Sequence, residues 1–167
     1  MSAEAGRRLP IAQVAPVAQA VVPGEGDSIE QLVGLLCEEL VRRGHEVTLF
    51  ATGDSRTSAR LRWLHGVGYL QDDPEPWDWG FRESMHAAFA FEQADEFDVV
   101  HTHDYHFALP FFGFTATPVV HTHHVEMSPE VIEACARYPH AHLVTVSDYQ
   151  RRVDIALVPR TLGPAPR

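Results

Sequence analysis

The chain has 167 residues, enough for one domain with a large core, and 45% of them are hydrophobic, as in folded globular proteins. Its formal net charge is −10, and its 13 basic residues are scattered, which argues against a sequence-independent nucleic-acid surface. No apolar run reaches the roughly 20 residues that span a bilayer, and residues 1–8 lack the features of a signal peptide. The sequence therefore predicts a cytoplasmic protein without a membrane span.

The first part of the chain predicts a strand, a helix and a second strand. Residues 9–15 form an apolar run, and a long loop with Pro and Gly follows. Asp27 and Glu30 have the spacing of a capping box, and Gly44 ends the helix that they begin. The second strand is residues 46–51, so the unit is a right-handed crossover. Five apolar residues make the expected inner face of the helix: Ile29, Leu32, Val33, Leu36 and Leu40.

The next part predicts a short third strand at residues 60–64 and then an irregular segment at 65–78. The nearby residues Trp63, Trp77 and Trp79 are interpreted as packing residues rather than as a sugar platform. Residues 81–94 predict a helix. Four residues at helical spacing are expected to face its core: Phe81, Met85, Ala88 and Phe89.

Two short β-branched runs, residues 98–100 and 117–120, each end in a histidine cluster. The clusters are His-Thr-His-Asp at 101–104 and His-Thr-His-His at 121–124. Short apolar strands are typical of the middle of a parallel sheet, and ligands bind beyond the carboxyl ends of such strands. A single loop histidine bonded to backbone groups needs no function. Two clusters at equivalent positions favour a binding site.

The last part of the chain predicts another helix and strand. Ser128 followed by Pro129 begins the helix, residues 141–146 form the strand, and Ser147 with Gln150 begins a further helix. Residues 155–158 predict an added edge strand. The expected fold is α/β: one Rossmann-like, doubly wound, mainly parallel sheet of about six to seven strands. It covers residues 9–158, between a flexible tail at 1–8 and an irregular tail at 159–167.

Five stretches carry a resemblance to a known family: IAQVAP (11–16), LVRRGHEVTLFATGDSRTSARL (40–61), FDVVHTHD (97–104), TPVVHTHH (117–124) and LVTVSDYQRR (143–152). The chain resembles the amino-terminal domain of the retaining glycosyltransferases of family 4. Their two Rossmann-like domains enclose the active site, with the acceptor on the amino-terminal side and the nucleotide sugar on the other. No donor-binding motif is found after residue 158. We therefore expect a partial enzyme that acts with a separate donor-binding chain.

The resemblance also implies roles for individual residues. His123 matches the histidine beside the transferred sugar and is the expected catalytic residue, while His124 stands where the family usually has glycine. Other substrate contacts are expected from His101, His103, Asp104, His121, His124, Ser147 and Arg151. The family's first loop has a glycine pair that approaches the donor phosphates. Asp27 and Ser28 stand there instead, so the first-loop contacts are assigned to Gly24, Gly26, Asp27 and Ser28.

Two other functions are considered. One is a non-catalytic sugar-binding, metabolite-binding or regulatory module, favoured by the loss of the glycine pair and by His124. The other is a zinc site with three ligands taken from the two clusters and His106, although no strict zinc motif is present. We predict no metal and no cofactor. The expected partners are a donor-binding chain, a sugar or small-molecule acceptor, and a second copy of the chain across the exposed cleft face. Cys37 and Cys135 are interpreted as buried hydrophobic residues in helices.

Overall fold

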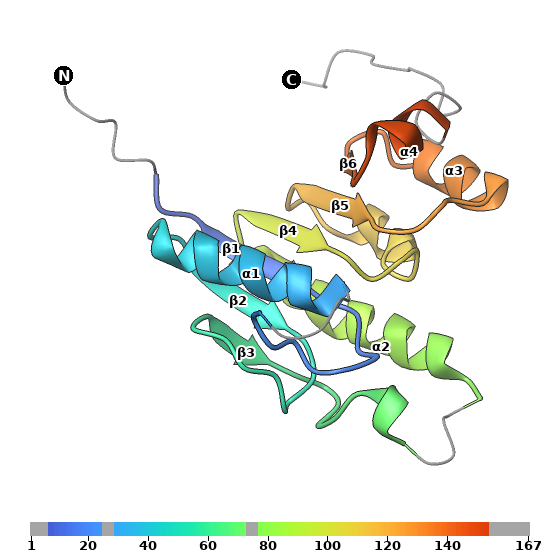
Figure 1. Ribbon diagram of the computed structural model, residues 1–167. Coiled ribbons are helices and arrows are strands. Elements are labelled where there is room, and N and C mark those ends of the chain that lie inside the picture. The colour runs from blue at the N-terminus through green and yellow to red at the C-terminus, as the bar shows by residue number, and fades with distance from the viewer. Residues whose placement is uncertain (1–6, 25–28, 73–76, 154–167) are drawn as a thin grey trace.

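The computed structural model describes residues 7–24, 29–72 and 77–153, and Figure 1 shows the arrangement of its elements. Six strands form one sheet in the order β3-β2-β1-β4-β5-β6, and every neighbouring pair is parallel. The strands are β1 (Pro10–Val14), β2 (Glu46–Phe50), β3 (Arg60–Arg62), β4 (Val99–Thr102), β5 (Val119–His123) and β6 (His142–Thr145). This order confirms the predicted doubly wound Rossmann-like fold. The proposed edge strand at residues 155–158 lies outside the described residues.

Helices cover both faces of this sheet. The α-helices are α1 (Ile29–Arg42), α2 (Trp79–Phe91), α3 (Pro129–Ala136) and α4 (Asp148–Val153). Three short 3₁₀ helices, η1 (Tyr69–Gln71), η2 (Ala94–Glu96) and η3 (Leu109–Phe114), connect them. Along β2, Val47 and Leu49 pack in the cluster that contains Val33 of α1, whereas Phe50 packs with Ala90 of α2. Alternate side chains of each strand therefore point to an α1 face and an α2 face. None of the described helices is long and apolar enough to cross a membrane.

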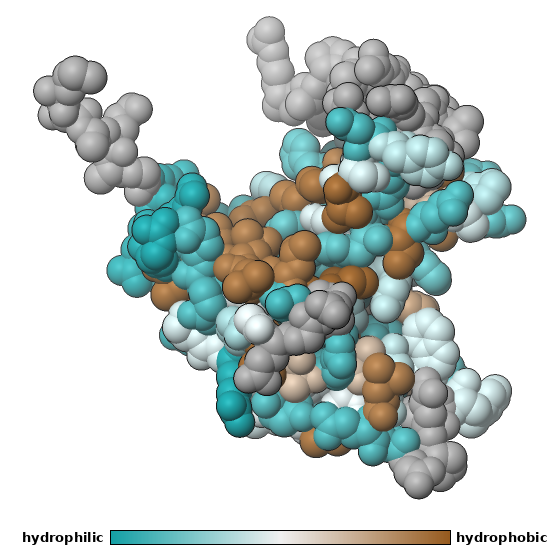
Figure 2. All heavy atoms as spheres, in the orientation of Figure 1, coloured by the Kyte–Doolittle hydropathy of each residue, from teal (hydrophilic) through white to brown (hydrophobic). Residues whose placement is uncertain are grey.

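Helix α1 packs on the sheet through Val33, with Ile29 and Leu40 partly buried beside it, as predicted, but Leu32 does not join this face. Its buried residues are Glu30, Val33, Gly34 and Cys37, and 46% of Leu32 is exposed. A Cβ on Gly34 would lie 3.1 Å from Val21 Cγ1, so the helix contacts the first loop where this glycine lies. The predicted inner face was wrong at Leu32. Figure 2 shows apolar side chains gathered over α1 in the centre of the molecular face, consistent with its exposed leucines.

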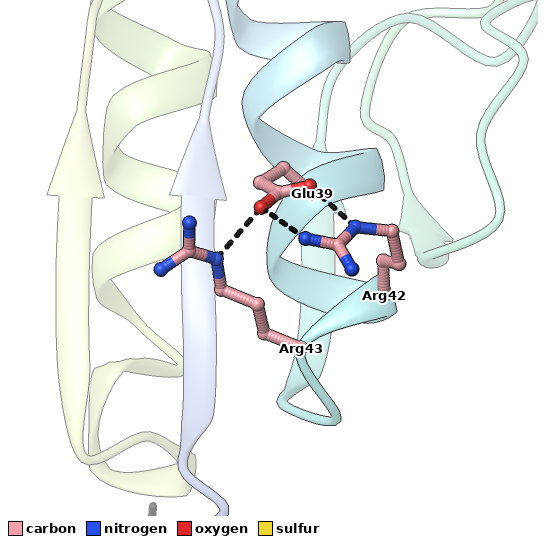
Figure 3. A network of polar contacts seen from close by, with 3 residues as sticks. All are labelled: Glu39, Arg42 and Arg43. Carbon is pink, nitrogen blue, oxygen red and sulfur yellow. Dashed lines mark hydrogen bonds and ion pairs between the residues drawn. The ribbon is translucent and has the colours of Figure 1, made fainter.

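The carboxyl end of α1 carries surface polar contacts at the end of the sheet opposite to the histidine clusters. Glu39 accepts hydrogen bonds from Arg42 Nη2 at 2.6 Å and from Arg43 Nε at 2.7 Å, as Figure 3 shows. The hydrogen bonds from Arg42 and then Arg43 lower the pKa of Glu39 to about 2. Gly44 follows with φ +92°, so the predicted glycine end of the helix is confirmed.

Helix α2 is rotated relative to the sequence prediction. It begins at Trp79, with the side chain of Asp78 accepting from Phe81 N, and it ends at Phe91. Its buried residues are Glu83, His86, Ala87 and Ala90. Phe81 is 61% exposed and Met85 is also exposed, so the predicted core face was wrong at these two positions. The reason is that both carboxylate oxygens of Glu83 accept from the Val17 N–H of the first loop, which turns the polar side of the helix inward in place of Phe81 and Met85.

Helices α3 and α4 begin as the sequence predicts. The Ser128 side chain accepts from Val131 N at the start of α3, and Ser147 Oγ accepts from Gln150 N at the start of α4. The Gln150 side chain does not complete a capping box with Ser147. Its Oε1 accepts instead from Val146 N at 3.0 Å, and its Nε2 donates to Val125 O at 2.6 Å. Gln150 thereby ties the end of β6 to the segment that follows β5.

Candidate functional site

The histidine clusters begin inside the strands rather than beyond them. His101 belongs to β4, while His121 and His123 belong to β5, and the sheet register pairs Thr102 with His121. The prediction that the strands end before the histidines was therefore wrong. Neutral imidazoles can be buried in a sheet when their ring nitrogens find partners. Only the last members of each cluster extend past the strands.

Strand alternation divides these side chains between the two faces of the sheet. Val100 packs with Ala12 and Val14 on the α2 face, so the neighbouring odd-numbered residues of β4 point to the α1 face. The contacts agree with this division. On the α1 face they join Gln13, His101, His103, Thr122 and His124, and on the α2 face they join Thr102, His121 and His123.

The side chains on the α1 face form a continuous hydrogen-bonded network across three strands. Gln13 Nε2 lies 3.3 Å from His101 Nδ1, and Gln13 Oε1 lies 3.0 Å from His103 Nε2. The network continues from His103 Nδ1 to His124 Nε2 at 2.9 Å, and from His101 Nε2 to Thr122 Oγ1 at 2.7 Å. It crosses the junction of β1 and β4, where the strand order changes direction. Ligands bind at such a point in doubly wound folds.

Burial keeps these histidines neutral. It lowers the pKa of His101 to about 4, with His124 adding a smaller effect, and it lowers the pKa of His103 well below its usual range. The pKa of His124, which is half-buried, is lowered for the same reason. At neutral pH each ring therefore has one nitrogen that donates and one that accepts.

On the α2 face, His121 and His123 differ in how their rings are satisfied. His121 Nδ1 hydrogen-bonds the Thr102 hydroxyl, and its ring packs edge-on against Phe112. His123 is only 2% exposed, yet neither of its ring nitrogens has a hydrogen-bond partner among the described residues. Burial, followed by His106 and His124, lowers the pKa of His123 to about 4. His123 is thus a neutral imidazole with unused hydrogen-bonding capacity at the carboxyl edge of the sheet.

Asp104 lies at the end of the first cluster and is fully buried. Neither carboxylate oxygen has a hydrogen-bond partner on another described residue, and burial, reinforced by Glu83, raises its pKa well above the usual range. Tyr105 follows with φ 55°, the one described non-glycine residue in the left-handed region. Such conformations are uncommon and cluster at functional sites.

Glu83 is a buried acidic residue that the sequence reasoning missed. Its carboxylate accepts from Val17 N at 3.1 and 3.3 Å, so α2 holds the start of the first loop. Burial raises the pKa of Glu83 to about 7, although the hydrogen bonds from Val17 and Tyr69 act in the opposite sense. The segment near η1 holds the same loop, because Tyr69 N donates to Val17 O and Leu70 N donates to Ala18 O. The first loop is therefore fixed on two sides.

The remaining predicted site residues lie in the first loop and around the end of β6. Gly24 has φ +80° at the end of the described part of the first loop, whereas Gly26, Asp27 and Ser28 lie outside the described residues. Ser147 is exposed and lines a cavity of about 180 Å³ together with His124 and Tyr149. Arg151 belongs to α4, and the position of its side chain is not described.

The described residues contain no group of three or more His, Cys, Asp or Glu side chains that is suited to a metal ion. The bare nitrogens of His101 and His103 are instead directed to Gln13 Nε2 and His124 Nε2, respectively. A cavity of about 330 Å³ lies at the opposite edge of the sheet. Its charged side chains include the ion pairs Arg8–Glu46 and Arg62–Glu96.

Comparisons with known proteins agree with this architecture. A family model described as Glycosyltransferase Family 4 matches residues 29–161, about four fifths of the chain. Among 14 similar solved chains is a sucrose-phosphate synthase from Thermosynechococcus elongatus, with a TM-score of 0.56 and 18% sequence identity. The similarity covers 88% of this chain and 45% of that chain, so this chain spans less than half of the synthase. At this identity the likeness shows the fold alone. The comparison with curated proteins finds no match.

Proposed function

This chain belongs to Glycosyltransferase Family 4, and we propose that it forms the acceptor side of a retaining glycosyltransferase active site. A second, donor-binding Rossmann-like unit would complete the site and supply most contacts to the nucleotide sugar. The solved relative supports a two-part arrangement, because this chain covers 45% of its length. The donor-binding unit is proposed to be a separate chain, and a homodimer through the exposed cleft face is proposed as a further assembly.

One observation carries this proposal: the unsatisfied ring of His123. Buried polar groups are almost always hydrogen-bonded, so a neutral imidazole with two unpartnered nitrogens indicates a place for a polar ligand. A sugar hydroxyl can donate to the bare ring nitrogen or accept from the protonated one, and two hydroxyls can satisfy both. In a site closed to water, such a hydrogen bond also stabilises charge that develops near the anomeric carbon. His123 is therefore the proposed catalytic residue.

The other proposed contacts come from neighbouring elements at the carboxyl ends of the strands. His124 and Ser147 line the cavity between the ends of β5 and β6, where an acceptor group can enter. Arg151 follows on α4 and is proposed to contact a phosphate or the donor unit. The first loop, which includes Gly24, is held by Glu83 and is proposed to approach the substrate from the β1 side. No bound cofactor is required by this scheme.

The test is to isolate the tagged chain from its native cells, identify any stoichiometric partner by mass spectrometry, and assay the complex. The assay uses UDP-glucose, GDP-mannose and ADP-glucose with a panel of sugar and sugar-phosphate acceptors. The variant His123→Ala is expected to lose on the order of 10²-fold or more in kcat. The matched control is His142→Ala, since His142 is exposed at the amino end of β6. Unchanged transfer by His123→Ala would refute the assigned role.

A non-catalytic sugar-binding module is the second candidate. The observation that favours it is His124, which fills the position of the family's usual glycine and hydrogen-bonds His103. Such a module would bind a sugar or sugar phosphate at the same edge without transferring it. Calorimetric binding of an acceptor, without turnover in any complex recovered from cells, would support this candidate over the enzyme.

A further inference from the structure

Gln13 is the buried polar residue at the centre of the histidine network. It lies in β1 with 1% of its surface exposed, directly opposite His101 in the sheet register. Its amide contacts both His101 and His103, through Nε2 and Oε1 respectively. A buried amide in an otherwise apolar strand is retained only when its donors and acceptors are paired. The pairing here is with two rings that can each exist in two neutral tautomers.

The chemistry of the amide fixes the direction of every bond in the network. Gln13 Oε1 can only accept, so His103 carries its proton on Nε2 and leaves Nδ1 bare. His124 must then donate from Nε2 to His103 Nδ1. On the other side, Gln13 Nε2 can only donate, so His101 Nδ1 is bare and its Nε2–H donates to Thr122 Oγ1. One residue thereby determines the tautomers of three histidines.

We propose that Gln13 is a positioning residue that locks His101, His103 and His124 as Nε2–H tautomers and so leaves Nδ1 of His124 as a hydrogen-bond acceptor. His124 lines the cavity between β5 and β6, and its acceptor nitrogen suits a ligand group that donates a hydrogen bond, such as a sugar hydroxyl. The tautomer lock concerns the free protein. Only the proposal that a sugar hydroxyl binds to Nδ1 of His124 rests on the function proposed above.

The amide also limits what the network can do. A proton can pass from His124 to His103, whose facing nitrogens are 2.9 Å apart, only after His124 has gained a second proton at Nδ1, and an amide does not readily pass a proton onward. Gln13 therefore ends the path and keeps His101 separate from His103, although their ring centroids are only 4.1 Å apart. The arrangement fits a fixed hydrogen-bonding surface rather than a proton conduit across the sheet.

The test is long-range ¹H–¹⁵N NMR of the histidine rings in the full chain without ligand, at neutral pH. We expect His101, His103 and His124 to show a protonated Nε2 and an unprotonated Nδ1. A proton on Nδ1 of His103 would mean that the amide is rotated and the direction reversed, which would overturn the proposal. This measurement requires neither a partner nor transferase activity, so it stands or fails independently of the proposed function.

The variant Gln13→Glu sharpens the test. A carboxylate only accepts, so it retains the bond from His103 Nε2–H but forces a proton onto His101 Nδ1. We expect the Nδ1 resonance of His101 to move from the unprotonated to the protonated class, while His103 and His124 keep their tautomers. The matched control is Gln71→Glu, the same change at an exposed residue of η1. An unchanged His101 in folded Gln13→Glu would contradict the proposal.

Discussion

Replacing Glu83 by glutamine is expected to remove a pH dependence of folding stability. Glu83 is fully buried, and burial raises the pKa of its carboxyl from 4.5 to about 7. Between these pH values the folded chain therefore holds a proton that the unfolded chain has lost. The corresponding contribution to the free energy of unfolding is fully present below pH 4.5 and disappears as the pH rises through about 7.

The pKa difference sets the size of this effect. At about 1.4 kcal/mol per pKa unit, a change from 4.5 to about 7 corresponds to about 3 kcal/mol. The amide introduced by Glu83→Gln keeps an oxygen that can accept from Val17 N, so the substitution removes the ionisation and retains a contact to the first loop. The free energy of unfolding of Glu83→Gln, measured relative to wild type, should therefore increase by about 3 kcal/mol as the pH rises from about 4.5 to 8.

The assay is urea unfolding of both proteins, followed by circular dichroism at several pH values from about 4.5 to 8. Comparing the two proteins cancels the contributions of the buried histidines, which titrate in both. Glu92→Gln is the matched control, because Glu92 is exposed at the end of the same helix. A difference between Glu83→Gln and wild type that stays constant over this pH range would refute the reasoning.

Three further predictions concern folding stability. Gly68→Ala should lower the free energy of unfolding by at least ~1–3 kcal/mol in urea titrations, because its Cβ would lie 2.4 Å from Ala18 O; wild-type stability would contradict this. Ser128→Ala should lower it by about 1 kcal/mol, since the side chain caps Val131 N, whereas Ser128→Asp should retain most of the stability. Glu39→Gln should leave the thermal midpoint nearly unchanged, because its ion pairs are on the surface; a large fall in differential scanning calorimetry would contradict this.

Local signals were sufficient for much of the fold. Gly44 and the Ser128–Pro129 pair mark helix ends through backbone geometry and capping, which depend on only a few neighbouring residues. The doubly wound fold class follows from repeated strand–helix–strand units, which have one strongly preferred hand. These features were therefore predictable before any contact between distant segments was known.

The orientation of α2 was not predictable in the same way. Its apolar residues Phe81 and Met85 suggest one face, while the buried face is set by Glu83 and His86. The buried carboxyl group is held by hydrogen bonds from Tyr69 and from Val17, which is more than sixty residues earlier. Hydrophobic periodicity considers each segment alone, so it cannot predict that a glutamate will be buried.

Gln13 did leave a signal in the sequence, as a single amide within the apolar run 9–15. Its partners could not be inferred, because they depend on β1 and β4 being neighbours in register. The alternation of His and Thr in both clusters also indicated strand structure with two different faces. Placing each cluster in a loop hid the fact that its members point in opposite directions.

The separation of the two faces bears on which histidines act on a ligand. On the α1 face, His103 is satisfied at both nitrogens, so its substitution should disturb the network before it affects chemistry. On the α2 face, His123 is equally buried but has no partner for either nitrogen among the described residues, so it gains most from a bound hydroxyl. The two kinds of histidine should therefore respond differently to a ligand. A bound sugar should shift the ring resonances of His123 strongly while His103 keeps its tautomer, and the opposite pattern would place the ligand on the α1 face.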